Sequence, residues 1–221
     1  MLALFALRRP RNLAAVLIPY AALGLFAAPL GDPAALLLAL SPSPLIGPWL
    51  ARIAGTREET VGALMIGTVV ISLLALLATV PAVATQVNTA LLLFGVGAAI
   101  AGAVPTMRDA LLPVLDGARY VAAAIALGAA AVASLPLMDL RAVAIAAGAL
   151  AIGTSSAAIG TKLFGGDPRA AAIGGGARDP SVAAGLALAA GLAGGPAVPL
   201  AYAALLALAL GLGKLLVRRQ S

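Results

Sequence analysis

Cysteine and histidine are both absent from this chain of 221 residues. Their absence excludes disulfides, thiol nucleophiles and the usual zinc and haem sites. Charge is scarce as well, at 10% of residues, whereas soluble domains carry about 25%. With 62% hydrophobic residues and a mean hydropathy of +1.10, the composition is that of an integral membrane protein whose partner is the lipid bilayer. No metal-ligand cluster and no Ser/His/Asp set can be assembled, so we expect no enzyme.

Charge-poor stretches long enough to cross a bilayer follow one another along the chain. A crossing helix needs about 20 apolar residues. By this measure the sequence predicts eight spans, at 12–31, 33–51, two within 60–107 with a hinge near 80–88, 120–138, 142–161, 166 to about 194, and about 196–213.

The basic residues support this count. Lys and Arg concentrate in cytoplasmic loops. With the N-terminus inside, the following fall inside: Arg8, Arg9, Arg11, Arg52, Arg57, Arg108, Arg119, Lys162, Arg169, Lys214, Arg218 and Arg219. Only Arg141 then falls outside. We expect a multi-pass protein of the cell inner membrane with both termini cytoplasmic. Because the basic residues are spread out, the net charge of +6 does not indicate nucleic-acid binding.

Two spans begin in the same way and break at a similar distance from their start. Gly-Asp-Pro opens both "GDPAALLLALSPSP" at residue 31 and "GDPRAAAIGGGARDP" at residue 166. An Asp before a Pro is a typical helix start. About ten residues later, Ser43-Pro44 and Asp179-Pro180 each look like a second cap and start. The proline-rich or glycine-rich residues between disfavour a continuous helix.

The doubled motif predicts an all-α membrane fold built from two inverted repeats, at 12–84 and 139–217, with a helix pair at 85–138 between them. Each repeat would carry one broken helix, as in many secondary transporters, where the breaks meet near the bilayer midplane. We therefore expect residues 41–48 to lie close to residues 174–180. The alternative is two Pro-kinked helices in an ordinary bundle.

Residues 8–30 and 36–81, which include "SPSPLIGPWLARIAGT", resemble the third to fifth helices of the bile acid:sodium symporter family. "AAIGGGARDPSVAAGLALA" at 171–189 resembles the second crossing helix of that family, and Gly176 to Asp179 match its break. The resemblance implies symport of a small organic solute by a ten-helix protein. This chain would begin at the third helix, and its spans four and five would be the surviving panel pair.

The sodium-binding positions that the resemblance implies are poorly matched. The acidic ligand of the family falls near Gly174, its Ser-Asn pair near Gly47-Pro48, and its glutamine near Gly24. Only Thr60 keeps a hydroxyl where the family has one. Sodium coupling by the family mechanism is therefore not expected, and coupling to Na⁺ or H⁺ stays open.

Arg178 and Asp179 are the first candidates for a binding site. An ionisable pair at midplane depth indicates contact with a solute or ion, for example Arg178 holding a carboxylate or replacing a sodium ion. The structural alternative is that Arg178 follows the negative end of one half-helix while Asp179 caps the positive end of the next. Further candidates are Gly176, Ser41, Ser43, Thr154, Ser155 and Ser156, although such hydroxyls usually bond to their own helix or join helices. Packing is the expected role of Thr68 and Ser72, and packing or anchoring at the membrane interface is the expected role of Tyr20 and Trp49.

The leading functional hypothesis is a secondary transporter that moves a small, anionic organic solute by alternating access. Two alternatives stay open. One is a non-transporting membrane scaffold or subunit, and the other is a truncated fragment of a ten-helix symporter. The substrate and the oligomeric state are not indicated by the sequence.

Overall fold

The computed structural model describes residues 9–44, 46–103, 105–192 and 195–218, and all regular secondary structure in these ranges is helical. The long helices are α2 (Pro10–Ala27), α5 (Glu58–Thr79), α6 (Ala84–Ala103), α7 (Pro105–Ser134), α8 (Leu140–Leu163) and α11 (Ala197–Arg218). The short ones are α3 (Pro33–Leu40), α4 (Gly47–Ile53), α9 (Pro168–Ala171), the π-helical turn η4 (Ala172–Gly176) and α10 (Pro180–Ala189). Single 3-10 turns occupy η1 (Ala28–Leu30), η2 (Pro81–Val83) and η3 (Leu135–Leu137). The predicted all-α class is confirmed.

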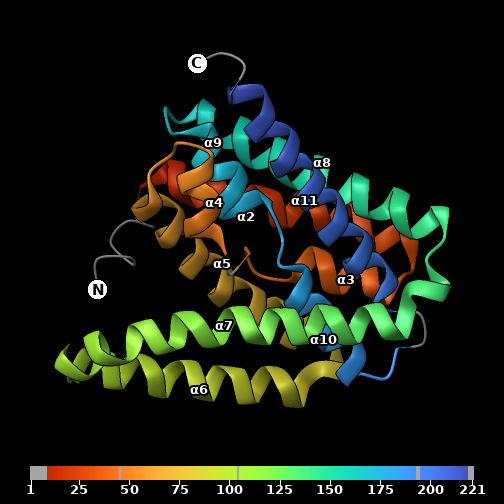
Figure 1. The fold of residues 1–221 in the computed structure, drawn as a ribbon, viewed down its shortest axis with the longest axis horizontal. Coiled ribbons are helices and arrows are strands. Elements are labelled where there is room, and N and C mark those ends of the chain that lie inside the picture. The colour runs from red at the N-terminus through yellow and green to blue at the C-terminus, as the bar shows by residue number, and fades with distance from the viewer. Residues whose placement is uncertain (1–8, 45, 104, 193–194, 219–221) are drawn as a thin grey trace.

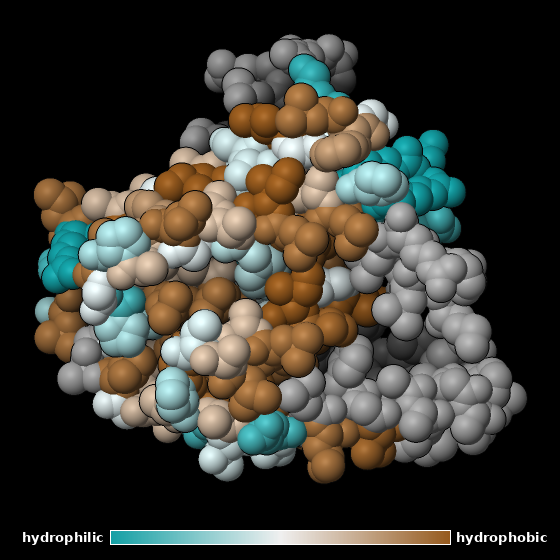
Figure 2. Space-filling view, turned by 180° about the vertical axis from the view of Figure 1, so that it is seen from behind, coloured by the Kyte–Doolittle hydropathy of each residue, from teal (hydrophilic) through white to brown (hydrophobic). Residues whose placement is uncertain are grey.

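Among the residues that the structure describes, four helical segments are long and apolar enough to cross a membrane: Pro10–Leu30, Glu58–Thr79, Tyr120–Leu137 and Leu140–Leu163. Their outward side chains are large and apolar, and Leu25, Val132 and Leu140 are 78%, 86% and 83% exposed. Apolar side chains cover much of the face drawn in Figure 2. A surface of this kind is unfavourable in water and is suited to lipid tails, so the fold is that of a membrane protein.

Aspartates begin the helices where the repeated motif predicts them. The side chain of Asp32 accepts hydrogen bonds from the first turn of α3, and that of Asp167 from the first turn of α9. A proline follows each aspartate at the first helical position, where its missing N–H is not needed. The predicted start at Ser43-Pro44 is wrong, because α4 begins at Gly47 and has no side-chain cap.

A second correction concerns residues 108–119, which the span count leaves between two crossings. They lie inside α7, a continuous helix of 30 residues. Charge opposes burial in lipid but not helix formation, and the Ala, Leu and Arg residues of this stretch favour a helix. At 1.5 Å per residue α7 is about 45 Å long, which exceeds the hydrocarbon core of about 30 Å. Arg108 and Arg119 are therefore helical residues rather than loop residues.

Helices α6 and α7 run side by side along one edge of the molecule, and the remaining helices lie together on one side of this pair (Figure 1). The turn η2 separates α5 from α6, which confirms the predicted hinge near residues 80–88. Within the larger group, α2 packs along α8, and Leu23, Ala146 and Tyr202 join α2, α8 and α11 in one buried cluster. This group holds both interrupted segments.

Glycines at the second interruption allow three backbones to come together. A Cβ on Gly175 would overlap the carbonyl oxygen of Ala15 on α2. A Cβ on Gly176 would overlap the carbonyl oxygen of Gly153 on α8, and a Cβ on Gly153 would in turn overlap that of Gly176. These glycines therefore fix η4 against α2 and α8, which positions the residues that follow it.

Candidate functional site

The two interruptions contact each other, which confirms the prediction that they meet. The backbone N–H of Asp179 donates to the carbonyl oxygen of Pro42 at 2.8 Å. The hydroxyl of Ser43 donates to the carbonyl oxygen of Ile173 at 3.2 Å. We call this region, residues 39–44 and 173–181, the crossing. Ser43 therefore contacts the second interruption, and α4 begins only at Gly47.

Arg178 lies in the crossing and is completely buried. Its Nε donates to the carbonyl oxygen of Ala39 at 3.1 Å, and its Nη1 donates to that of Gly175 at 3.0 Å. The guanidinium carbon lies 4.0 Å from the centre of the Tyr20 ring, within cation–π distance. Ala39 and Gly175 belong to the last turns of α3 and η4, where helix carbonyls carry partial negative charge. Arg178 thus places its positive charge between the carbonyl ends of both interrupted segments.

The backbone at Arg178 is held from a third direction. Its N–H donates to the hydroxyl of Tyr202, a fully buried residue of α11, at 2.9 Å. Among the described residues, no acceptor lies within hydrogen-bond distance of Arg178 Nη2. The side chain has no exposed surface, so in this conformation a solute cannot reach it.

Asp179 lies at the N-terminal end of a helix, where the partial charge is positive, whereas Arg178 lies at carbonyl ends, where it is negative. One oxygen of its side chain, Oδ1, accepts hydrogen bonds from the N–H groups of Ser181 and Val182, at 2.8 and 3.2 Å, and from the Ser181 hydroxyl. Pro180 occupies the first helical position of α10. The carboxylate therefore lies at the positive N-terminal end of α10. Arg178 and Asp179 thus take the positions at helix ends that the structural alternative predicts.

Hydroxyl groups of α5 bond to the first interruption, although packing was their expected role. Thr68 Oγ1 accepts the N–H of Ser43 at 3.0 Å, and the Ser72 hydroxyl donates to the carbonyl oxygen of Leu40. Both side chains are buried. Their spacing of four residues puts them on one face of the helix, which is the sequence signal that could have identified them.

Two tyrosines complete the surroundings of Arg178, and sequence reasoning missed both. The Tyr20 hydroxyl donates to the carbonyl oxygens of Ser41 and Thr68, at 3.2 and 2.9 Å. Tyr202 binds the backbone of Arg178 from α11. Nothing in the local sequence marks either tyrosine, because each comes from a helix that reaches the crossing only through the tertiary fold.

The remaining predicted site residues bond locally or lie away from the crossing. The hydroxyls of Thr154 and Ser156 donate to carbonyl oxygens of their own helix, at 2.7 and 3.1 Å, and Ser155 is exposed. The Ser41 hydroxyl likewise donates to Leu38 of α3 at 2.8 Å. Thr60 lies in the first turn of α5, about two helical turns before Thr68.

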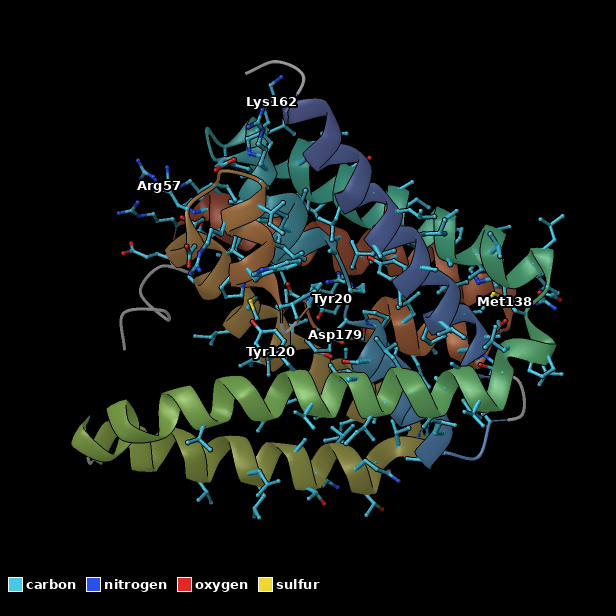
Figure 3. All side chains as sticks on the ribbon, viewed as in Figure 1. Tyr20, Arg57, Tyr120, Met138, Lys162 and Asp179 are labelled. Carbon is cyan, nitrogen blue, oxygen red and sulfur yellow. The ribbon has the colours of Figure 1, made fainter. Side chains whose placement is uncertain are left out.

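A cleft of about 470 Å³ opens beside the crossing, between α7 and the larger group of helices. This volume is in the range of small-molecule sites. Its lining includes Ala123 and Leu127 of α7, Trp49 and Ile53 of α4, and Leu206 and Leu210 of α11. Among the described residues of the lining, only Asp179 and Ser181 have a carboxylate or hydroxyl group, and Arg178 is not one of the lining residues. Figure 3 shows Asp179 between Tyr20 and α7.

A separate contact joins the two halves of the chain near one end of the molecule. The Thr56 hydroxyl, between α4 and α5, donates to Asp167 Oδ2 before α9. Partial burial acts to raise the pKa of Asp167, but the Thr56 hydrogen bond, two backbone N–H donors and the nearby Arg169 outweigh it and lower the pKa. The carboxylate form is therefore favoured in the folded protein.

The chain matches no protein-family model, no curated protein and no solved structure. The resemblance to the bile acid:sodium symporter family accordingly stays a prediction.

Proposed function

We propose that the chain is a secondary transporter of the cell inner membrane that moves a small organic solute by alternating access. The observation that carries the proposal is the contact between two interrupted helical segments beside an apolar cleft. Within a bilayer, irregular backbone is tolerated only where it is buried in protein or lines a cavity. Carriers use such crossings as the fixed point around which the two sides open in turn.

In this proposal eight spans cross the membrane, and segments 12–84 and 139–217 form inverted repeats. The shared Gly-Asp-Pro starts support the repeats, as do the aspartate caps of α3 and α9 and the similar distance to each interruption. The pair α6 and α7 is the element against which the repeats would move. Its position along one edge of the molecule suits this role (Figure 1).

The orientation proposed is both termini in the cytoplasm. Arg57 and Lys162 lie toward one end of the molecule and Met138 toward the other (Figure 3). Basic residues favour the cytoplasmic side, so the end with Arg57 and Lys162 would face inward. Sodium is not the coupling ion in this proposal, because Gly174 replaces the expected acidic ligand and Arg178 brings a fixed positive charge.

Cysteine accessibility tests the proposal, because the natural chain has no cysteine. Ala207 lines the cleft, whereas Ala209, also exposed on α11, does not. An Ala207→Cys variant in oriented membrane vesicles should react with a membrane-impermeant maleimide added to either side, because the cleft opens to each side in turn. Ala209→Cys is the matched control and should react from neither side. Labelling of Ala207→Cys from one side only would support the alternative of a non-transporting scaffold.

A further inference from the structure

We propose that the cleft takes an uncharged solute, with an apolar body and hydroxyl or amide donors at one end, and that its binding requires no ion. This inference rests on the proposed transport function and specifies its substrate class. The proposed solute differs from the anionic solute expected from the sequence. The reason is that side chains of the protein already lie at the partial charges of its helix ends.

The position suited to a cation is occupied by the chain itself. Interrupted helices in carriers direct carbonyl ends at a bound cation. Here the carbonyl oxygens of Ala39 and Gly175 both accept hydrogen bonds from the guanidinium of Arg178, which is fully buried. A permanently bonded arginine side chain supplies the positive charge that a coupling ion would otherwise bring.

The position suited to an anion is occupied as well. The N-terminal end of a half-helix is where a carrier holds the negative group of its substrate. At α10 the N–H groups of Ser181 and Val182 already donate to the carboxylate of Asp179. An anionic solute would have to displace that carboxylate, and it would meet the negative charge of Asp179 on the cleft wall.

The rest of the cleft offers no compensation for a charge. Its lining is otherwise apolar, from Trp49 and Ile53 on one wall to Leu127 on another. An anionic solute would lose its hydration there without gaining a partner. A cationic solute would meet only the Asp179 carboxylate, whose charge is already compensated by the N-terminal end of α10. An uncharged solute can pack its body against these walls. Its hydroxyl or amide groups can hydrogen-bond to Asp179 and Ser181, because carboxylate and hydroxyl oxygens accept several bonds each.

The test uses Trp49, the only tryptophan in the chain, which lines the cleft and is 49% exposed. Three probes of nearly equal shape differ in charge: phenyl β-D-glucoside is uncharged, phenyl β-D-glucuronide is an anion, and phenyl 2-amino-2-deoxy-β-D-glucoside is a cation. Each is titrated into the purified protein in sodium chloride and in choline chloride at equal ionic strength, while tryptophan emission is recorded.

We expect the glucoside to change the emission saturably and to bind at least about tenfold more tightly than either charged probe, because only the charged probes leave an uncompensated charge in the apolar cleft. The dissociation constant should be the same in both salts. An Ala207→Phe variant, which fills the cleft, should lose the response, whereas Ala209→Phe on the other side of α11 should keep it.

Tighter binding of the glucuronide or of the amino sugar would overturn the proposal, as would a sodium-dependent affinity or the absence of any saturable response to the glucoside. These outcomes are independent of the transport test. Two-sided labelling of Ala207→Cys with no preference for the uncharged probe would leave the carrier in place and reject the substrate class. One-sided labelling would reject the carrier itself.

Discussion

At the scale of single residues, Arg178 shows how a fully buried arginine can be accommodated in a membrane protein. A guanidinium has five N–H donors, and burying them without acceptors is costly. Two of its nitrogens donate to carbonyl oxygens that have no partner within their own helices, and the ring of Tyr20 faces the charge. The carbonyl ends of the interrupted segments therefore supply acceptors for two nitrogens of the arginine, and the arginine supplies donors for both ends.

Replacing Arg178 by alanine should lower the free energy of unfolding by about 3 kcal/mol, because two charge-assisted hydrogen bonds are lost. The variant also gains a cavity of guanidinium shape. Low concentrations of guanidinium chloride should therefore raise the melting temperature of Arg178→Ala, whereas they lower that of the natural protein. The exposed Arg169→Ala variant is the control and should show no rescue. Equal destabilisation of all three proteins by guanidinium would contradict this account.

Two glycine substitutions should change the free energy of unfolding in opposite directions. Gly175→Ala places a methyl group on the carbonyl oxygen of Ala15, and overpacking of this kind costs about 1–3 kcal/mol. Gly185→Ala in α10 meets nothing within 4 Å and should stabilise the helix by about 0.5–1 kcal/mol. Thermal unfolding in detergent measures both changes. A tolerated Gly175→Ala would show that η4 is not packed as closely against α2 as the structure indicates.

At the scale of helices, the first interruption depends on groups supplied by α5. Thr68→Val removes the acceptor of the buried Ser43 N–H, which should cost about 1–3 kcal/mol. Thr89→Val is the control, because the Thr89 hydroxyl is exposed and bonds only to its own helix. The difference in melting temperature between the two variants gives the contribution of the contact. If both variants melt at the same temperature, the hydrogen bond between the Ser43 N–H and Thr68 Oγ1 does not stabilise the first interruption.

The contact between Thr56 and Asp167 predicts a pH dependence with a definite sign. The pKa of Asp167 is lower in the folded protein than in the unfolded chain. The contribution of its carboxylate to the free energy of unfolding is therefore fully present above the unfolded pKa. The contribution is lost as the pH falls through the folded pKa, on the acidic side of the usual aspartate range. Thr56→Val should therefore flatten the acid limb of the melting-temperature profile, and Thr56→Ser should restore it. A profile unchanged by Thr56→Val would mean that the hydroxyl does not affect Asp167.

The helix starts that were predicted correctly are determined by neighbouring residues, and the meeting of the two interruptions was predicted from the doubled motif. Asp32-Pro33 and Asp167-Pro168 start helices because cap and first-turn N–H groups lie within three positions of each other. Ser43-Pro44 carries the same local signal, but α4 begins only at Gly47, and the polar groups of Ser43 bond to Thr68 and Ile173 from distant parts of the chain. The environment of Arg178 was not predictable for the same reason, because Tyr20 and Tyr202 reach it from separate helices.

At the scale of the whole molecule, charge is placed in two ways. Inside the crossing, Arg178 and Asp179 each lie at helix ends of the opposite partial charge. Toward one end, Arg57 and Lys162 lie where water and lipid headgroups would meet the protein (Figure 3). The first arrangement bears on what the cleft can bind, and the second bears on how the protein is inserted in the membrane.

Reporter fusions test the insertion. Alkaline phosphatase is active only in the periplasm, so a fusion after Met138, between α7 and α8, should be active. Fusions after Phe164, which follows α8, and at the C-terminus should be silent. In the proposed orientation Arg57 and Lys162 lie on the cytoplasmic side, and an even number of crossings returns the chain to that side. Each silent fusion must be detected as full-length protein by immunoblot, which controls for expression.

An active C-terminal fusion would require an odd number of crossings. The two repeats could not then be inverted in the proposed way, and the crossing would have to be explained as a kinked pair of helices in an ordinary bundle.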